Sequence, residues 1–141
     1  INPPIALYYI QGLNTTAVHG HAALFGVYGI LGIGLMMFML RGLYPHREWN
    51  DKLIGWAFWL TNIGLLVMVT ISLLPIGIMQ SVASIKEGYW YARSAEFMQT
   101  EMMNTLRWLR VPGDILLAVG EMLLVIFIIG LKTGWSLKDK R

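Results

Sequence analysis

Two histidines separated by a single residue, His19 and His21, are the residues whose types and spacing point most clearly to chemistry. They begin an uncharged stretch that runs to Arg41, so we expect them on a helix. Side chains two residues apart on an α-helix point in directions roughly 200° apart, since each residue turns about 100°. The two imidazoles therefore cannot easily chelate one metal ion, but each can ligate its own metal centre. Two metals flanking one membrane helix suggest two haems with electron transfer between them.

The surroundings of the two histidines are expected to differ. The face of His19 is predicted to continue through small residues, namely Ala22, Ala23 and Gly26. The face of His21 is predicted to carry larger ones, namely Leu24, Phe25 and Tyr28. A smooth face allows a flat macrocycle to lie against the helix, and the larger side chains would pack a second ring more tightly. For either histidine alone, an interfacial side chain without a metal is the simpler interpretation.

The composition predicts that these residues lie in a membrane. Hydrophobic residues make up 56% of the chain and charged residues 13%, about half the usual charged share of soluble domains. Three long apolar runs each suffice to span a bilayer, which needs about 20 residues. The predicted fold is an all-α membrane protein with three transmembrane helices. The predicted helices cover about 15–41, 52–84 and 113–132, and an outer-side loop covers about 85–112.

Three details of these helices are also predicted. The second apolar run would be about 50 Å long if wholly helical, which exceeds the hydrocarbon core, and Pro75 is expected to bend it. Gly26, Gly29 and Gly32 recur every three residues and predict close contact with another helix. The methionines are interpreted as packing residues rather than copper ligands.

Charges in the connectors predict the orientation. The first connector and the carboxy-terminal tail have an excess of Lys and Arg, which favours the cytoplasmic side. His19, His21 and the 85–112 loop then lie towards the outer face of the membrane. The chain has no cysteine, which excludes disulfides and thiolate-bound haem or clusters. Its formal net charge of +3 is too small to indicate nucleic-acid binding.

Three segments resemble a known family. Residues 14–29 (NTTAVHGHAALFGVYG) resemble the tenth core helix of the nitric oxide reductases, within the haem–copper oxidase superfamily. Residues 90–97 (WYARSAEF) and 105–114 (TLRWLRVPGD) resemble the quinol-dependent, single-chain branch of these enzymes. The resemblance extends over essentially the whole chain, but it corresponds only to the last three helices of a much longer catalytic subunit. It implies that these helices are the last part of a larger haem–copper-oxidase-type helix bundle in a bacterial cytoplasmic membrane.

The resemblance implies roles for both histidines. It makes His19 the proximal ligand of the high-spin haem b3 at the active site, and His21 an axial ligand of the low-spin haem b. The family's active site also contains a non-haem iron held by three histidines and a glutamate. These ligands, and the second ligand of haem b, are expected in the rest of the catalytic polypeptide, upstream of Ile1. The third histidine, His46, is interpreted as a solvated residue of the first connector. By itself this chain is expected to be inactive.

Four further residues before or at the start of the third span have two interpretations each. Arg107, Trp108 and Arg110 either bind the anionic haem propionates or anchor the chain at the membrane interface. Asp114 either caps the third helix or accepts a hydrogen bond from the quinol head group.

Glu121, inside the third span, is expected to face protein and to be hydrogen-bonded or protonated, since ionisable groups in a membrane are costly. Proton transfer is a further hypothesis for this residue.

Two classes of function remain from the sequence. The first is the carboxy-terminal part of a quinol-dependent nitric oxide reductase, which in denitrification reduces two NO to N2O and water. A haem–copper oxygen reductase is a near variant of this class. The second is a non-enzymatic dihaem electron carrier of cytochrome b type, for which the two histidines would be the whole functional site. Iron rather than copper at the second metal would separate the reductase from the oxidase.

Overall fold

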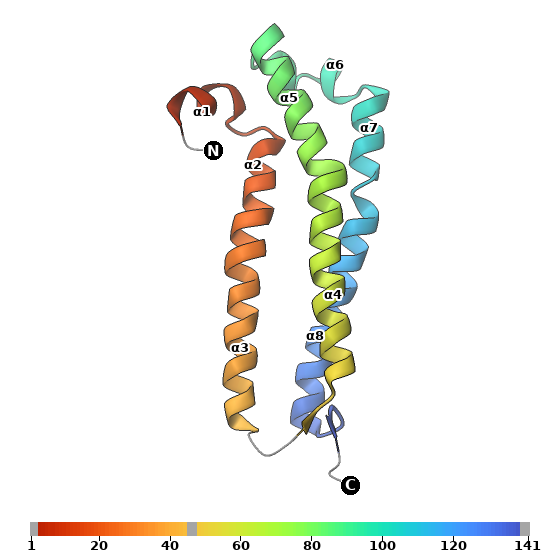
Figure 1. Ribbon diagram of the computed structural model, residues 1–141. Coiled ribbons are helices and arrows are strands. Elements are labelled where there is room, and N and C mark those ends of the chain that lie inside the picture. Colours follow the sequence, from red (N-terminus) through yellow and green to blue (C-terminus); the bar gives the residue numbers. More distant parts are fainter. Residues whose placement is uncertain (1–2, 45–47, 139–141) are drawn as a thin grey trace.

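The structure, a computed structural model, describes residues 3–44 and 48–138. Within these residues, three helices are long and apolar enough to cross a membrane, and they run lengthwise through the molecule (Figure 1). They are Asn14–Leu43, Asp51–Glu87 and Glu101–Thr133. The predicted all-α, multi-pass membrane fold is therefore confirmed, although each helix is longer than its apolar run.

The first span begins with α2 (Asn14–His19), continues as a π-helix, η1 (Gly20–Gly29), and ends as α3 (Ile30–Leu43). The short helix α1 (Pro4–Ile10) precedes it and lies across its upper end (Figure 1). Gly12 makes the turn between α1 and α2 with a φ of 70°, a conformation that glycine adopts without steric cost. The π-helix has i→i+5 hydrogen bonds, so it changes which residues share a face directly after His19.

The second span consists of α4 (Asp51–Val67), the π-helix η2 (Met68–Leu73) and α5 (Leu74–Glu87). Pro75, the residue that the sequence predicts as the site of a bend, lies two residues after the end of η2. Proline lacks the backbone donor, and its ring clashes with the carbonyl four residues earlier, here that of Ile71. A π-helical segment accommodates both effects without ending the helix.

The region expected as an outer-side loop contains helical segments. It includes the end of α5, the 3-10 turn η3 (Tyr91–Arg93), α6 (Ala95–Met98) and α7 (Glu101–Trp108). After a turn at Leu109 and Arg110, α7 is followed by α8 (Val111–Thr133). Pro112 occupies the first turn of α8, where its missing donor costs nothing. The residues of α7 are more polar than those of α8, which is why an apolar run does not reveal this helix.

The tightest helix contact is between α4 and α8, and glycines on both helices form it. A Cβ atom at Gly64 would lie 2.4 Å from the backbone nitrogen of Leu117, and one at Gly113 would lie 2.7 Å from that of Met68. A Cβ at Gly120 would lie 2.6 Å from the backbone nitrogen of Thr61. Small residues let membrane helices approach closely, so that backbones rather than side chains are in contact.

The predicted glycine contacts of the first span are mostly absent from the described residues. A Cβ at Gly26 would lie 3.3 Å from the Leu65 side chain, so this glycine does face α4. A Cβ at Gly29 would meet only Phe25 of its own helix, and one at Gly32 would meet nothing within 4 Å. Within the described residues, Gly29 and Gly32 therefore make no close contact with another helix, because much of this span packs loosely on its neighbours.

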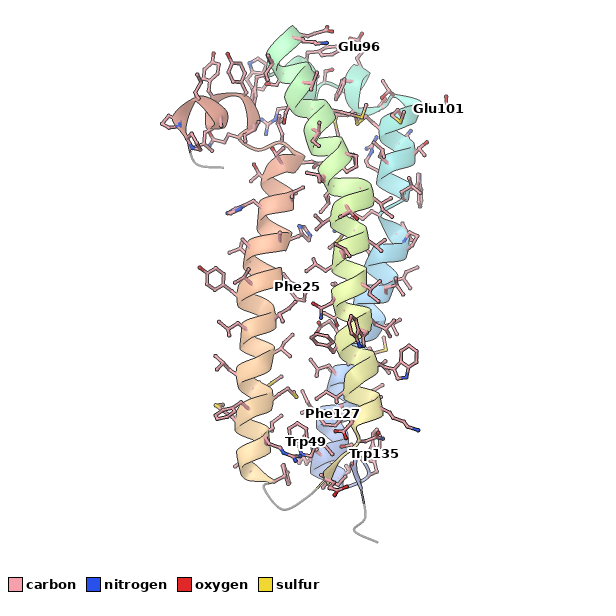
Figure 2. All side chains as sticks on the ribbon, viewed as in Figure 1. Phe25, Trp49, Glu96, Glu101, Phe127 and Trp135 are labelled. Carbon is pink, nitrogen blue, oxygen red and sulfur yellow. The ribbon has the colours of Figure 1, made fainter. Side chains whose placement is uncertain are left out.

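A small sheet closes the lower end of the molecule. Strands β1 (Glu48–Trp49) and β2 (Leu137–Lys138) pair antiparallel, with Trp49 opposite Leu137. The Trp49 ring packs edge-on against Phe127, with 5.3 Å between ring centroids, and the Arg41 guanidinium lies 5.1 Å from the Trp49 ring (Figure 2). The first connector and the tail are thereby held together at one end of the bundle.

Candidate functional site

The ring of His21 is oriented by its own helix. It is half-buried, and its Nδ1 lies 2.8 Å from the carbonyl oxygen of Ala17, one turn earlier. A carbonyl oxygen only accepts hydrogen bonds, so this contact requires a proton on Nδ1 and leaves the Nε2 lone pair available. Histidines that bind metals usually donate their other ring N–H in this way, which sets both tautomer and ring orientation. The geometry of His21 therefore fits an axial ligand.

An open groove of ≈ 450 Å³ lies beside His21. Its walls are apolar and come from the first span, from α4 and η2, and from α8. They are Ala17, Gly20, Leu24, Phe25, Leu65, Met68 and Leu117. Figure 2 shows Phe25 on the side of the first span that faces α4. At Gly20 an added Cβ would meet nothing within 4 Å, so the backbone next to the imidazole is open. An open apolar groove with a free nitrogen lone pair at its edge suits a flat macrocycle.

His19 is exposed and does not line this groove. The structure therefore separates the environments of the two imidazoles, as helical geometry predicts for residues i and i+2.

Two residues of the predicted faces lie elsewhere. Gly26 faces Leu65 of α4 and not the side of His19, because in a π-helix it stands one turn after His21. Tyr28 is exposed and does not line the groove beside His21.

Gln80 on α5 links the start of α2, on the helix that carries both histidines, to the 3-10 turn η3. Its side chain is only 5% exposed. Its Oε1 accepts a hydrogen bond of 2.9 Å from the backbone N–H of Asn14, and its Nε2 donates one of 3.1 Å to the carbonyl of Ala92. Beside it, a Cβ at Gly77 would lie 2.8 Å from the backbone nitrogen of Thr15, so α5 touches the first turn of α2. Gln80 thus sets where the helix carrying both histidines begins.

Sequence reasoning did not single out Gln80. The available signal was a polar amide within the uncharged run from Leu53 to Ile85. Such a group must find partners when it is buried. The partners of Gln80 lie far away in sequence. The pattern therefore predicts that the amide is hydrogen-bonded, but not which groups it binds.

The residues near the start of α8 form local pairs. The Arg110 Nε lies 3.0 Å from the Asp114 carboxylate, one turn away, and both side chains are about 40% exposed. Among the described residues, the N-cap position of α8 is Arg110, which makes no side-chain cap, and Asp114 lies in the first turn of the helix. Its carboxylate accepts from Arg110 instead of from the first-turn amides. Asp114 also precedes Leu117 of the His21 groove by one helical turn.

Arg107 and Trp108 differ in their contacts. The Arg107 guanidinium donates to the Met98 carbonyl and, over 2.9 Å, to Asn104 Oδ1. Trp108 is 74% exposed.

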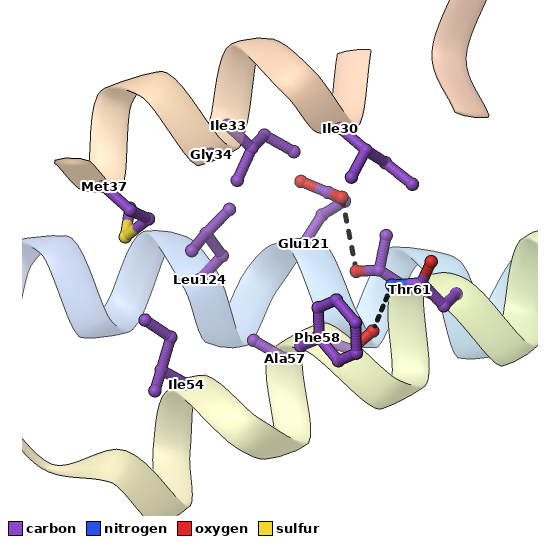
Figure 3. A pocket seen from close by; sticks show the side chains of 11 residues that line it. Ile30, Ile33, Gly34, Met37, Ile54, Ala57, Phe58, Thr61, Glu121 and Leu124 are labelled. Atoms are coloured by element: carbon purple, nitrogen blue, oxygen red, sulfur yellow. Dashed lines mark hydrogen bonds between the residues drawn. The ribbon is translucent and has the colours of Figure 1, made fainter. Parts of the chain in front are cut away.

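Glu121 faces protein and accepts a hydrogen bond, which confirms the expectation for this residue. It lies in the middle of α8, at a cavity of ≈ 190 Å³ between α3, α4 and α8 (Figure 3). The hydroxyl of Thr61 on α4 donates to Glu121 Oε1 over 3.3 Å. Thr61 itself is only 6% exposed. It is a second polar residue of the long uncharged run that sequence reasoning passed over.

In the part of the chain that the structure describes, no three residues of the types His, Cys, Asp and Glu lie close enough to hold one metal ion together. The third histidine, His46, lies outside the described residues.

Two comparisons with known proteins agree with each other. Residues 1–116 match the family model described as cytochrome c and quinol oxidase polypeptide I. The chain is also 27% identical over 124 residues to a nitric oxide reductase polypeptide of Stutzerimonas stutzeri, a match that covers 80% of this chain and 24% of that protein. The chain thus spans about a quarter of the length of the curated relative it matches.

Proposed function

The chain belongs to the cytochrome c and quinol oxidase polypeptide I family, and from this premise we propose that it is the haem-binding part of a membrane nitric oxide reductase. The complete enzyme would reduce two NO to N2O and water with two protons and with two electrons from quinol. The similarity to a nitric oxide reductase polypeptide supports this choice within the family.

The observation that carries the proposal is the environment of His21. Its Nδ1–H is committed to the Ala17 carbonyl, and its other nitrogen is free at the edge of an apolar groove. His21 would bind the low-spin haem b there, and exposed His19 would bind the high-spin haem b3 on the other side of the helix. When bound, the first haem would supply one-electron transfer and the second an iron that activates NO. The protein's part is to orient both rings on one helix and to exclude water from the groove with Leu24, Phe25 and Leu65.

Other parts of the site would lie outside this chain. The non-haem iron, its ligands and the second ligand of haem b are assigned to the rest of the catalytic polypeptide. This assignment is consistent with the match to only 24% of the relative. This chain would therefore be inactive by itself.

The residues before and at the start of α8 would serve the haems and the electron donor. Arg107, Trp108 and Arg110 are proposed to face the haem propionates, for which guanidinium groups are suited partners. Asp114 is proposed to accept a hydrogen bond from the quinol head group. Its carboxylate has about four lone-pair sites, so the contact with Arg110 leaves acceptor capacity.

The proposed location is a bacterial cytoplasmic membrane, with His19, His21 and the 85–112 region towards the outer face. Pairing of β1 with β2 supports this orientation, because it places the two segments with excess cationic charge at the same end. The tail is then cytoplasmic.

Single histidine variants of the complete enzyme test the haem assignment. His21→Ala should remove the low-spin haem signal, whereas His19→Ala should abolish NO turnover and leave that signal unchanged. His46→Ala is the matched control and should retain both. Equal loss of both haem signals in the His19 and His21 variants, with the protein still folded, would refute the separate assignment.

An oxygen reductase is the second candidate, because the matching family is described by its oxidases. Purified enzyme that consumes O2 much faster than NO, with copper at the second metal, would favour it. Reversible haem reduction with no turnover of either gas would instead indicate an electron carrier.

A further inference from the structure

The cavity at Glu121 is the second prominent feature inside the membrane-spanning region. Most of its wall is aliphatic, with Ile30, Ile33 and Met37 of α3 on one side (Figure 3). Three polar side chains interrupt this wall, those of Thr61, Asn62 and Glu121. Glu121 is about 15 Å along α8 from its first residue, and the helix continues about 18 Å beyond it. The carboxyl group is thus far from either end of its helix.

The cavity has room for water beside its three polar side chains. One water molecule needs about 10–15 Å³ of such a volume and two to four polar partners. The volume of ≈ 190 Å³ is well above that minimum. The carboxyl group of Glu121, the Thr61 hydroxyl and the Asn62 amide supply the partners. The Asn62 Nδ2 donates to the Phe58 carbonyl over 2.8 Å, so its Oδ1 remains to accept from water.

Glu121 is also the group in this cavity that can exchange a proton. An ionisable residue within a membrane is costly and usually marks a functional site. Of the described residues that line the cavity from α3, α4 and α8, no other is titratable. Thr61 holds one carboxyl oxygen of Glu121, which leaves the second oxygen for water. A proton that passes through this cavity must therefore pass at Glu121 or along water beside it.

The cavity lies next to the groove of His21 along the α4–α8 contact. Leu65 and Leu117 line that groove, and each stands one helical turn from a cavity residue, Thr61 and Glu121 respectively. In the other direction the cavity reaches Met37 and Ile54, towards the end where β1 and β2 pair. Glu121 thus stands between the first-connector end of the bundle and the proposed haem groove.

We propose that Glu121 is a proton-exchange site. Its carboxylate takes one proton that enters from the first-connector end, and the resulting carboxylic acid returns that proton to cavity water on the side of the His21 groove. One proton enters and one leaves, and no electron moves. Thr61 is the positioning residue that orients the carboxyl group. The assignment rests on the proposed function in one respect, since reduction of two NO consumes two protons that must reach the site.

The test uses the complete enzyme in vesicles and three variants at neighbouring positions of α8. Glu121→Gln keeps the shape but cannot exchange a proton, whereas Glu121→Asp can. Met122→Gln places the same amide on the exposed side of the helix and is the matched control. Two quantities are measured without NO. They are the infrared difference spectrum on haem reduction, in H2O and D2O, and proton uptake reported by a pH dye.

We expect a carboxylic acid carbonyl band that shifts in D2O and is missing in Glu121→Gln. Proton uptake in that variant should slow by about a hundredfold or more, since a positioned acid–base group contributes typically about 10²–10⁴-fold. Glu121→Asp should restore most of the uptake, and Met122→Gln should match the unmodified enzyme.

Three results would overturn the assignment. The first is an unchanged infrared band and uptake rate in Glu121→Gln. The second is a slowing of uptake in Met122→Gln equal to that in Glu121→Gln. The third is loss of haem absorbance in both Glu121 variants but not in Met122→Gln, which would indicate a structural role. Absence of NO turnover in the unmodified enzyme, with band and uptake intact, would overturn the proposed function and leave the proton-exchange site standing.

Discussion

Gly64→Ala should destabilise the bundle, because it places a methyl group where two helix backbones touch. The new Cβ would lie 2.4 Å from the Leu117 nitrogen, 2.9 Å from the Leu117 Cα and 2.9 Å from the Gly113 oxygen. Carbon atoms in normal contact are about 3.5–4.0 Å apart, so α4 and α8 must separate by roughly 1 Å. No side chain can rotate to relieve this clash, since all three neighbours are backbone atoms.

The expected change in the free energy of unfolding of Gly64→Ala results from two opposing effects. Overpacking costs typically about 1–3 kcal/mol, and the separation also loosens the contacts at Gly113 and Gly120. Alanine gains up to about 1 kcal/mol over glycine in helix propensity. Gly64→Ala should therefore lose about 1–2 kcal/mol. Gly55→Ala on the same helix is the control, because its Cβ would meet nothing within 4 Å. It should gain up to about 1 kcal/mol.

Titration of the complete protein with SDS in mixed micelles, followed by circular dichroism, measures both free energies of unfolding. The free energies of unfolding of the two variants should differ by about 1–3 kcal/mol, with opposite signs relative to the unmodified protein. If Gly64→Ala is as stable as Gly55→Ala, the close approach of α4 to α8 is refuted.

Two further predictions concern residues around the proposed site. Asp114→Ala should lower quinol-driven turnover by about tenfold or more, because a charge-assisted hydrogen bond is lost, and should spare turnover with an artificial donor. The free energy of unfolding of this variant should fall by less than about 0.5 kcal/mol, since the ion pair of Asp114 with Arg110 is half-exposed. An equal loss of turnover with quinol and with the artificial donor would contradict the quinol role. Gln80→Leu should cost about 2–3 kcal/mol in SDS titration, because the Asn14 N–H and the Ala92 carbonyl lose their partner. Gln99→Leu, at an exposed position, should cost little, and equal losses would contradict the positioning role of Gln80.

The histidine helix shows how far sequence reasoning reached and where it ended. The separation of His19 from His21 follows from the angle per residue, and it survives the change from α- to π-helix at Gly20. The predicted position of Gly26 on the face of His19 was wrong, because the i→i+5 hydrogen bonds of the π-helix change the rotation per residue after Gly20. The sequence around Gly20 contains no proline, so it does not show that the α-helix becomes a π-helix there.

Asp114 and Glu121 show the same limit for side chains. An acidic residue in the first turn of a helix is a good candidate for a cap, and only the structure shows its carboxylate turned to Arg110. For Glu121, the cost of charge in a membrane predicts that it faces protein. That its partner is Thr61 depends on the register between two helices sixty residues apart in sequence.

The sequence by itself determined the number of membrane-spanning helices and the divergence of the two histidines. The reason is that both depend on short-range quantities: the apolar length needed to cross hydrocarbon, and the rotation per residue of a helix. The tertiary structure alone decided which faces meet. Contact between α4 and α8 requires Gly64, Gly113 and Gly120 to coincide at one crossing, and the cavity at Glu121 exists because α3 does not fill the space beside it. Such fits depend on shapes contributed by distant segments, which no window along the chain contains.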